Sequence, residues 1–202
     1  MAVGTLDIID LAEAREALND TEVDTSDDTE LENYVAAVSR FLDWMYGPVI
    51  QRSVTESHDG GGSCIVLAVR PVASVTSVTV DDVALSASDW HAERSSQDRT
   101  LLSGEISRMS GTSRGGVFEF GVDNVDVVYT AGRFADRASV DARFRQAAVL
   151  TLQHAFRAEQ RTAFQDSQGF VTPTSGYPKD WDLRAVRSIL MGERRRRGIG
   201  VA

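Results

Sequence analysis

The sequence predicts an α+β fold, a helical bundle formed by N- and C-terminal helices with a small antiparallel β subdomain inserted between them. Two observations carry this prediction. Apolar residues recur at gaps of three and four near both ends of the 202-residue chain, whereas the middle changes to a period of two. We therefore divide the chain into N-terminal bundle helices over 1–48, a β insertion over 49–132, a bundle helix over 133–161, and an exposed arm, C-terminal helix and basic tail over 162–202.

Two helices are predicted at the N-terminus. Asp10 and Glu13 have the spacing of a capping box, in which an N-cap acceptor and an acid three residues later satisfy free backbone amides. A short helix over 11–18 follows them. Asp27 and Glu30 repeat this spacing before a longer helix. Its apolar residues fall on one face: Leu31, Tyr34, Val35, Val38, Phe41, Leu42 and Met45.

The second helix has a clear predicted end. Gly47 can adopt the left-handed conformation that closes a helix, and Pro48 cannot continue it. This end marks the boundary between the N-terminal helices and the β insertion.

Short strands are expected in the middle, where apolar residues alternate or cluster between turn residues. Asp81 and Asp82 are interpreted as a turn. The glycines 60–62 are interpreted as a flexible hairpin tip, because a phosphate-binding loop would end in Gly-Lys-Ser/Thr and open a helix. The expected strands are 64–69, 78–80, 84–85, 88–93, 100–107, 117–120 and 125–130.

Helix is expected again after Gly132. Ser139 can cap a helix that ends near Gln160 and carries an apolar stripe. Residues 162–179 are poor in aliphatic side chains and rich in Gly and Pro, which is typical of a long exposed arm. Leu183, Val186, Ile189 and Leu190 then indicate a last short helix, followed by a basic tail.

Charge is unevenly distributed along the chain. The net charge of −9 argues against a general nucleic-acid binder. Residues 1–45 hold 12 acidic and 2 basic residues, whereas residues 133–202 hold 7 acidic and 13 basic ones. A protein with an acidic N-terminal part and a basic C-terminal part can dock head to tail on another copy or on an oppositely charged partner. The alternative is that the charged faces only keep the protein soluble. The chain shows no signal peptide and no membrane span, so we expect synthesis in the cytoplasm and no membrane partner.

Residue types that carry chemistry are scattered. His58, His91 and His154 share no metal-binding spacing, and Cys64 is the only cysteine. No nucleophile elbow, Walker loop or dinucleotide fingerprint is present. We therefore expect no enzyme, no metal and no cofactor.

The candidate site residues are contact residues near the C-terminus. Three interpretations of the four consecutive arginines stay open: a solvated helix end, a docking site for an acidic surface that includes a neighbouring copy's residues 1–45, or a nucleic-acid contact. The arm over 162–179, the C-terminal helix and the basic tail are the expected interaction surfaces. The candidate partner-binding residues are Phe170, Tyr177, Trp181, Arg194, Arg195, Arg196 and Arg197.

Four stretches of the chain have a distinctive order and spacing. They are Asp10-Leu11-Ala12-Glu13-Ala14 through Leu18, Asp27-Asp28-Thr29-Glu30-Leu31 into Tyr34-Val35-Ala36-Ala37, Arg70-Pro71-Val72-Ala73-Ser74-Val75-Thr76-Ser77-Val78 before Ser88-Asp89-Trp90, and Val127-Val128-Tyr129-Thr130-Ala131-Gly132 before Gln146-Ala147-Ala148. Together they resemble the head–tail adaptor, or head-completion connector, family of HK97-type siphophages and gene-transfer particles. The resemblance does not extend to the arm, and the link after Gly132 lacks the proline often seen before the third helix of that family.

This resemblance implies a structural subunit of the virion without catalytic residues. It implies a ring, commonly of twelve copies (a dodecamer), between the portal protein and a tail stopper or terminator, assembled in the host cytoplasm. DNA would pass through the lumen without sequence-specific binding, and an acidic wall would not grip it. Two alternatives remain: a tail terminator or stopper of the same particle, and a small host enzyme or DNA-binding regulatory protein.

Overall fold

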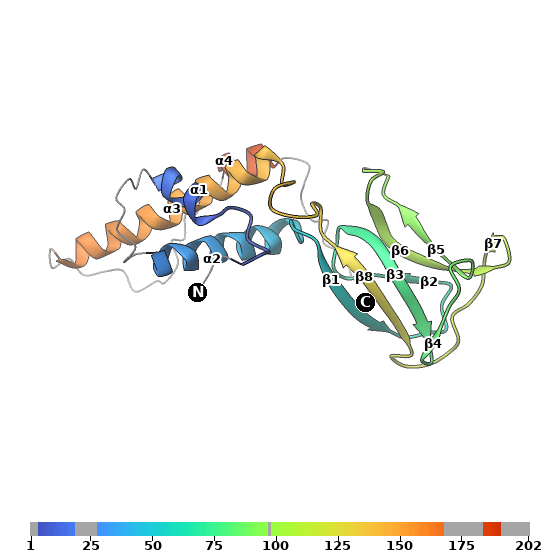
Figure 1. The fold of residues 1–202 in the computed structure, drawn as a ribbon. Coiled ribbons are helices and arrows are strands. Elements are labelled where there is room, and N and C mark those ends of the chain that lie inside the picture. Colours follow the sequence, from blue (N-terminus) through green and yellow to red (C-terminus); the bar gives the residue numbers. More distant parts are fainter. Residues whose placement is uncertain (1–3, 19–27, 97, 168–183, 191–202) are drawn as a thin grey trace. The chain divides into compact units, whose positions relative to one another are not determined.

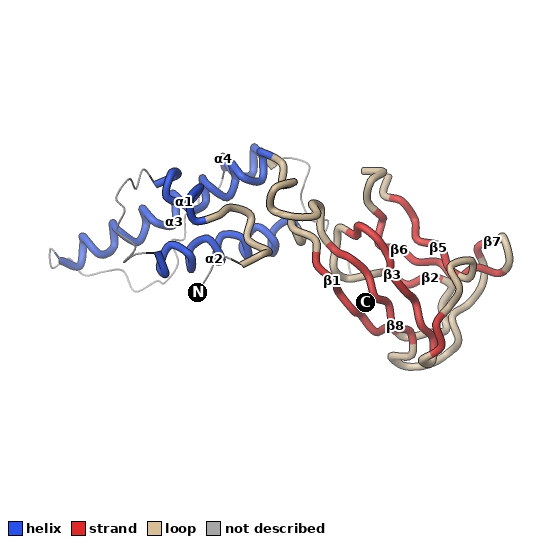
Figure 2. Tube along the Cα trace, in the orientation of Figure 1, coloured by secondary structure: helices blue, strands red, loops and turns tan. Residues whose placement is uncertain are grey.

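The computed structural model describes residues 4–18, 28–96, 98–167 and 184–190. It divides into two compact units, one made of Met1–Tyr46 with Asp136–Ala202 and the other of Gly47–Ala135. Within the described ranges, helices belong to the first unit and strands to the second (Figure 1, Figure 2). None of the described helices is long and apolar enough to cross a bilayer.

The helical unit packs its helices through the faces that the apolar spacing marks. α1, α2 and α3 contact one another, and α4 packs on α3. Leu31, Val35, Val38 and Leu42 of α2 are buried at helical spacing, as are Phe144, Ala148 and Leu152 of α3. The helices are α1 (Leu11–Leu18), α2 (Asp28–Tyr46), α3 (Ala142–Ser167) and α4 (Arg184–Ile189).

Polar contacts hold the segment before α1 against the helices. The buried Ile8 donates its N–H to Ser39 Oγ at 3.0 Å. The Arg137 guanidinium donates to the carbonyl oxygen of Asp7 at 2.9 Å. Arg145 donates to Glu13 Oε1 at 2.7 Å, so the start of α3 is tied to the start of α1. The two arginine bonds connect residues that lie more than 100 positions apart in the sequence.

Helix ends follow local chemistry. The predicted capping box is confirmed, since Asp10 N–H donates to Glu13 Oε2 at 3.0 Å and Glu13 N–H donates to Asp10 Oδ1 at 2.8 Å. Gly47, just after α2, has the predicted left-handed φ of 81°. The predicted cap of α3 is wrong. Asp141 accepts the Arg143 N–H at 2.7 Å and caps the helix, whereas Ser139 forms a turn with Asp136.

The β unit is an eight-stranded antiparallel sheet in its described residues. Its main path runs β1-β8-β3-β6-β2; β4 pairs with β3, and β5 and β7 pair with β6. β3 pairs with β8 along its length but meets β6 only through Val72 and Leu102. The strands are β1 (Arg52–His58), β2 (Cys64–Val66), β3 (Val72–Val80), β4 (Val83–Ala84), β5 (Trp90–Arg94), β6 (Leu102–Ser110), β7 (Ser113–Arg114) and β8 (Val125–Ala131).

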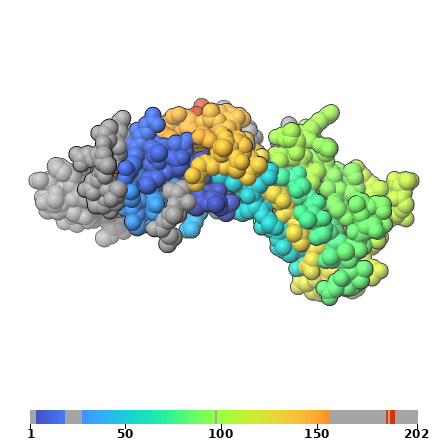
Figure 3. Space-filling model, viewed as in Figure 1, coloured from blue at the N-terminus to red at the C-terminus, as the bar shows by residue number. Residues whose placement is uncertain are grey.

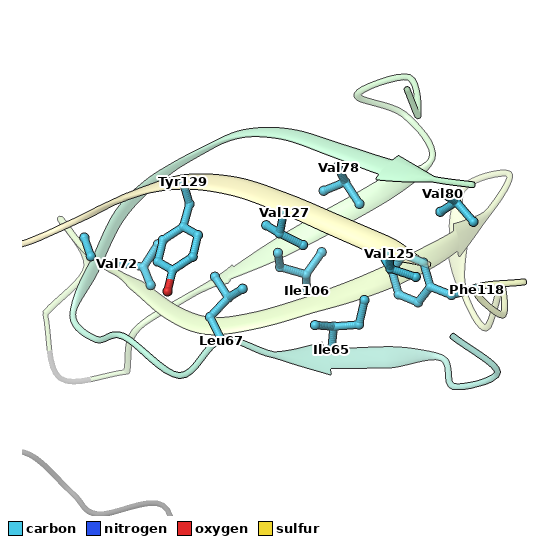
Figure 4. Close-up of a cluster of buried hydrophobic side chains, with 11 residues drawn as sticks. Ile65, Leu67, Val72, Val78, Val80, Ile106, Phe118, Val125, Val127 and Tyr129 are labelled. Carbon is cyan, nitrogen blue, oxygen red and sulfur yellow. The ribbon is translucent and has the colours of Figure 1, made fainter. Parts of the chain in front are cut away.

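A core of its own fills the β unit. Side chains from β3 and β8 point toward side chains from β2 and β6, and Figure 4 shows them between two layers of strands. The alternation along β8 explains the arrangement, because every second residue is buried. The buried set is Ile65, Leu67, Val72, Val78, Val80, Ile106, Phe118, Val125, Val127, Tyr129 and Ala131.

The predicted fold class is wrong. The chain is not a helical bundle with a small β subdomain, because the described β part is a large eight-stranded sheet with a separate core. One cause is β1, a strand of mainly polar residues that gives no apolar signal. A second is the length of β3, which has nine residues where the sequence predicted three.

Two further local predictions fail in the β unit. Residues 117–120 were expected as a strand but lie in the loop before β8. The glycine-rich segment 60–62 was expected as a hairpin tip. It instead connects β1, which pairs with β8, to β2, which pairs with β6. Asp81 and Asp82 do form the expected turn, both with positive φ.

Candidate functional site

The cysteine and histidine side chains, which are the candidates for catalysis or metal binding, do not gather in one place. Cys64 is exposed on β2, and His91 is exposed on the edge strand β5. His154 lies half-buried on α3, in the other unit. Among the described residues, no three His, Cys, Asp or Glu side chains are placed to hold a metal ion together.

His58 lies beside a carboxylate in the β unit. Its Nε2 is 3.3 Å from Glu56 Oε2, and Glu56 itself is only 15% exposed. Glu56 points inward from β1 and accepts the backbone N–H of Ala68 at 2.9 Å and of Val69 at 3.1 Å. The Tyr129 hydroxyl of β8 donates to the same carboxylate and accepts the Val69 N–H at 3.2 Å.

The surroundings of Glu56 favour its charged form. Burial raises the pKa of this carboxyl, but the hydrogen bonds from Ala68, Tyr129 and Val69, together with nearby His58, outweigh burial and lower the pKa below its usual value. Burial is the largest cause that raises the pKa of the Tyr129 hydroxyl. The hydrogen bond to Glu56 and the negative charge of Glu56 raise it further. The proton therefore stays on the tyrosine and the charge on the glutamate.

This cluster serves as a structural clamp. Both carboxylate oxygens of Glu56 are used by donors from the segment after β2 and from β8. The carboxylate thereby joins β1 to a segment with which it shares no strand pairing. We name Glu56, Tyr129, Ala68 and Val69 the carboxylate clamp.

A second feature is the outer face of the layer formed by β1, β8 and β3. The register places hydroxyl-bearing side chains side by side in cross-strand rows. Ser57 donates to Asp126 Oδ1 at 2.6 Å, and Asp126 is the only charged member of these rows. This face, the hydroxyl face, consists of Ser53, Thr130 and Ser74, then Thr55, Val128 and Ser77, then Ser57, Asp126 and Thr79.

A third feature is the end of the β unit where the segment after β1, the β3–β4 turn and the loop before β8 meet. Asp81 N–H donates to the carbonyl oxygen of Asn124, and Asp123 N–H donates to Asp59 Oδ1. A shallow groove at this end is lined by Val80, Asp81, Val83, Leu85, Arg108 and Glu119. In Figure 3 the green atoms of the β3–β4 turn adjoin the yellow atoms of the loop before β8.

The candidate residues predicted from the sequence are not among these features. Phe170, Tyr177, Trp181 and Arg194 to Arg197 all lie outside the described residues. The loop before β8 was not predicted, because residues 117–120 have the apolar pattern of a strand. The glycines on either side, Gly115, Gly116 and Gly121, were the signal that this apolar stretch belongs to a loop.

Searches of protein-family models and of curated proteins found no match. Solved structures do match over almost the whole chain. A chain from the "neck of empty GTA particle computed with C6 symmetry" has a TM-score of 0.65 and 18% identity, over 99% of this chain and 95% of that one. A chain from the "neck of native GTA particle computed with C12 symmetry" has a TM-score of 0.62 and 17% identity, over the same shares.

A chain from the virion of the native gene transfer agent (GTA) particle matches with a TM-score of 0.60 and 16% identity, over 93% of this chain and 90% of that one. At these identities the likeness is one of fold. It extends over the helical unit and the β unit, since almost the whole chain is covered. The protein therefore has the fold of chains found in gene transfer agent particles and their necks.

Proposed function

We propose that this protein is a structural subunit of the neck of a tailed phage or gene-transfer particle. In this proposal it is an adaptor in a ring between the portal protein and the tail. The observation that supports it best is the likeness of fold to chains from particle necks over 99% of the sequence. A match of that extent includes both units and their order along the chain, which a chance resemblance of one sheet would not.

The ring is part of the proposal. The similar neck chains come from particles reconstructed with C6 and C12 symmetry, which supports a cyclic assembly of this chain, with twelve copies as the expected number. The neck lies in the virion, so the protein's final location in this proposal is the head–tail interface.

The charge pattern suits a passage for DNA. The hydroxyl face of the β unit carries a single charge, that of Asp126, and the groove end carries mainly acids. Two arginines of the β unit lie beside acids of the same unit: Arg108 is 3.9 Å from Asp89, and Arg114 pairs with Glu93. Surfaces of this kind offer little attraction to phosphates, so DNA would pass without being bound.

We also propose that the protein has no catalytic activity. The carboxylate clamp brings together two groups with shifted pKa values, and both carboxylate oxygens of Glu56 accept hydrogen bonds from backbone N–H groups and from Tyr129. A stopper of the same particle is the second candidate, since it too is a neck component. The position of the ring, directly on the portal or one layer further toward the tail, separates the two.

Deletion of the gene from a particle-producing genome tests the proposal. We expect filled heads and free tails in the lysate by electron microscopy, and tailed particles again when the wild-type chain is supplied from a plasmid. Intact, infectious particles from the deletion strain would refute it. DNA binding by the purified chain that weakens with salt would favour the regulatory alternative instead.

A further inference from the structure

Four apolar side chains stand out into solvent at the groove end of the β unit. Phe120 is 92% exposed, Val122 79%, Val83 65% and Val117 59%. Three of them belong to the loop before β8, and Val83 opens β4 beside the groove. We name these four residues the apolar tip. Exposed apolar groups that cluster on one end of a unit indicate a contact surface.

The loop that carries the apolar tip is held in place. Phe118, only 1% exposed, anchors the loop in the core. Its N–H donates to the carbonyl oxygen of Gly62 and its carbonyl oxygen accepts the Gly61 N–H, both at 2.9 Å. Asn124 accepts the Gly60 N–H at 2.9 Å and donates to the carbonyl oxygen of Glu119 at 3.1 Å. The apolar tip is therefore preformed, so a partner would bind it without paying the cost of ordering the loop.

Carboxylates surround the apolar tip. They are Asp59, Asp81, Asp82, Glu119 and Asp123, and none of them makes an ion pair with another described residue. Arg108, the described cation that lines the groove, lies 3.9 Å from Asp89 Oδ1 and donates to the carbonyl oxygen of Asp89. The end of the β unit thus combines apolar contact area with unneutralised negative charge.

The chain itself contains a segment of the opposite character. Its last residues, 194–202, read Arg-Arg-Arg-Arg-Gly-Ile-Gly-Val-Ala, with four cations followed by two branched apolar side chains. We infer that the apolar tip and its carboxylates bind the C-terminal segment of a second copy of this chain. The arginines match the carboxylates, and Ile199 and Val201 match Phe120 and the apolar wall of the groove.

Three acids of the helical unit suit this role less well. In the helical unit, Asp10 caps α1, Glu13 accepts from Arg145, and Asp28 pairs with Arg15. A contact between one end of a copy and a different surface of the next is heterologous, and such contacts generate rings or filaments. Such a contact would join copies within the proposed ring, but it is tested on the purified chain, so its failure would leave the proposed place in the neck standing.

Directed disulfide formation tests the inference in the full-length chain. In a Cys64→Ser background, one preparation carries Val122→Cys and a second, isotope-labelled preparation carries Ile199→Cys. The two are mixed and oxidised with diamide, and the linked peptides are identified by mass spectrometry. We expect mixed-isotope links between positions 122 and 199, reduced about tenfold by 1 M NaCl because the carboxylate–arginine attraction is screened.

A matched control places the first cysteine at Ser53, on the hydroxyl face, which the inference leaves free. Links to position 199 at an equal rate from position 53 would overturn the inference, as would an absence of links from position 122. A doubly substituted chain, Val122→Cys with Ile199→Cys, that forms links only within one copy would also overturn it. Circular dichroism of each variant checks its fold, since positions 53 and 122 are both exposed.

Discussion

Replacing Glu56 by alanine removes the acceptor of three donors, the N–H groups of Ala68 and Val69 and the Tyr129 hydroxyl. The bonds from Val69 and Tyr129 are partly buried, whereas the bond from Ala68 is exposed and water can replace it. Hydrogen bonds to a charged group contribute about 1.5 kcal/mol each at the lower end of their range, so we expect Glu56→Ala to destabilise the β unit by about 3 kcal/mol. Glu56→Gln keeps one acceptor and should cost about half as much.

The pH dependence of this effect has a defined sign. The pKa of Glu56 is lower in the folded protein than its usual value, so its contribution to stability is present above the unfolded-state pKa of about 4.3. That contribution is lost as the pH falls through the folded-state pKa. We therefore expect the stability difference between wild type and Glu56→Gln to be constant near neutral pH and to shrink under acidic conditions.

Hydrogen–deuterium exchange during urea unfolding tests this prediction, because it reports the stability of the β unit and of the helical unit separately. Glu105→Gln on β6 is the matched control, since this exposed carboxylate accepts no described hydrogen bond. The β unit of the control should unfold like wild type. Equal stability of Glu56→Ala and wild type, or a difference that grows in acid, would refute the role given to the carboxylate clamp.

Three further predictions concern single contacts. Gly47→Ala should destabilise the chain by more than about 2 kcal/mol in urea, because φ is 81° and a Cβ would lie 2.0 Å from the Arg70 carbonyl oxygen. Asp10→Ala should cost about 1 kcal/mol and speed amide exchange in α1, since Glu13 N–H loses its acceptor. Leu152→Ala, at a side chain with no exposure, should cost about 3 kcal/mol by cavity formation, measured by thermal unfolding.

For each of these three variants, one result would contradict the prediction. Unchanged stability of Gly47→Ala would mean that the backbone at residue 47 can move away from the Arg70 carbonyl oxygen. Exchange in α1 that does not change in Asp10→Ala would mean that tertiary packing alone holds this helix. A loss below about 1 kcal/mol for Leu152→Ala would mean that the helical core relaxes to fill the space.

The helical unit was largely predictable because its signals are local. The Asp10 capping box, the period of the apolar residues in α2 and the glycine after it each depend on neighbours within a few positions. The start of α3 was placed two residues too early, because Ser139 and Asp141 are both good N-caps and their local sequences do not distinguish them.

The β unit was less predictable because its order depends on distant partners. β1 reads as polar sequence, and it becomes a strand through seven pairs with β8, about 70 positions away. Its inward glutamate, Glu56, has partners 12, 13 and 73 positions away. No local pattern predicts that this partly buried carboxylate will accept bonds from distant parts of the chain, so both the strand and the clamp were missed.

The exposed loop before β8 shows the opposite error. Val117, Phe118 and Phe120 satisfy a strand pattern, yet only Phe118 is buried. Whether an apolar stretch pairs with a neighbour or packs through a single anchor is decided by the chain around it, here by the segment 60–62. The sequence therefore indicated apolar character at this position and not its exposure.

The proposed place in the neck is best tested by a cryo-electron microscopy reconstruction of purified particles, together with a mass-spectrometric inventory of their proteins. We expect a ring of copies of this chain between portal and tail, with the helical and β units both recognisable in the density. Particles that carry a complete neck and tail but contain no copy of this chain would contradict it.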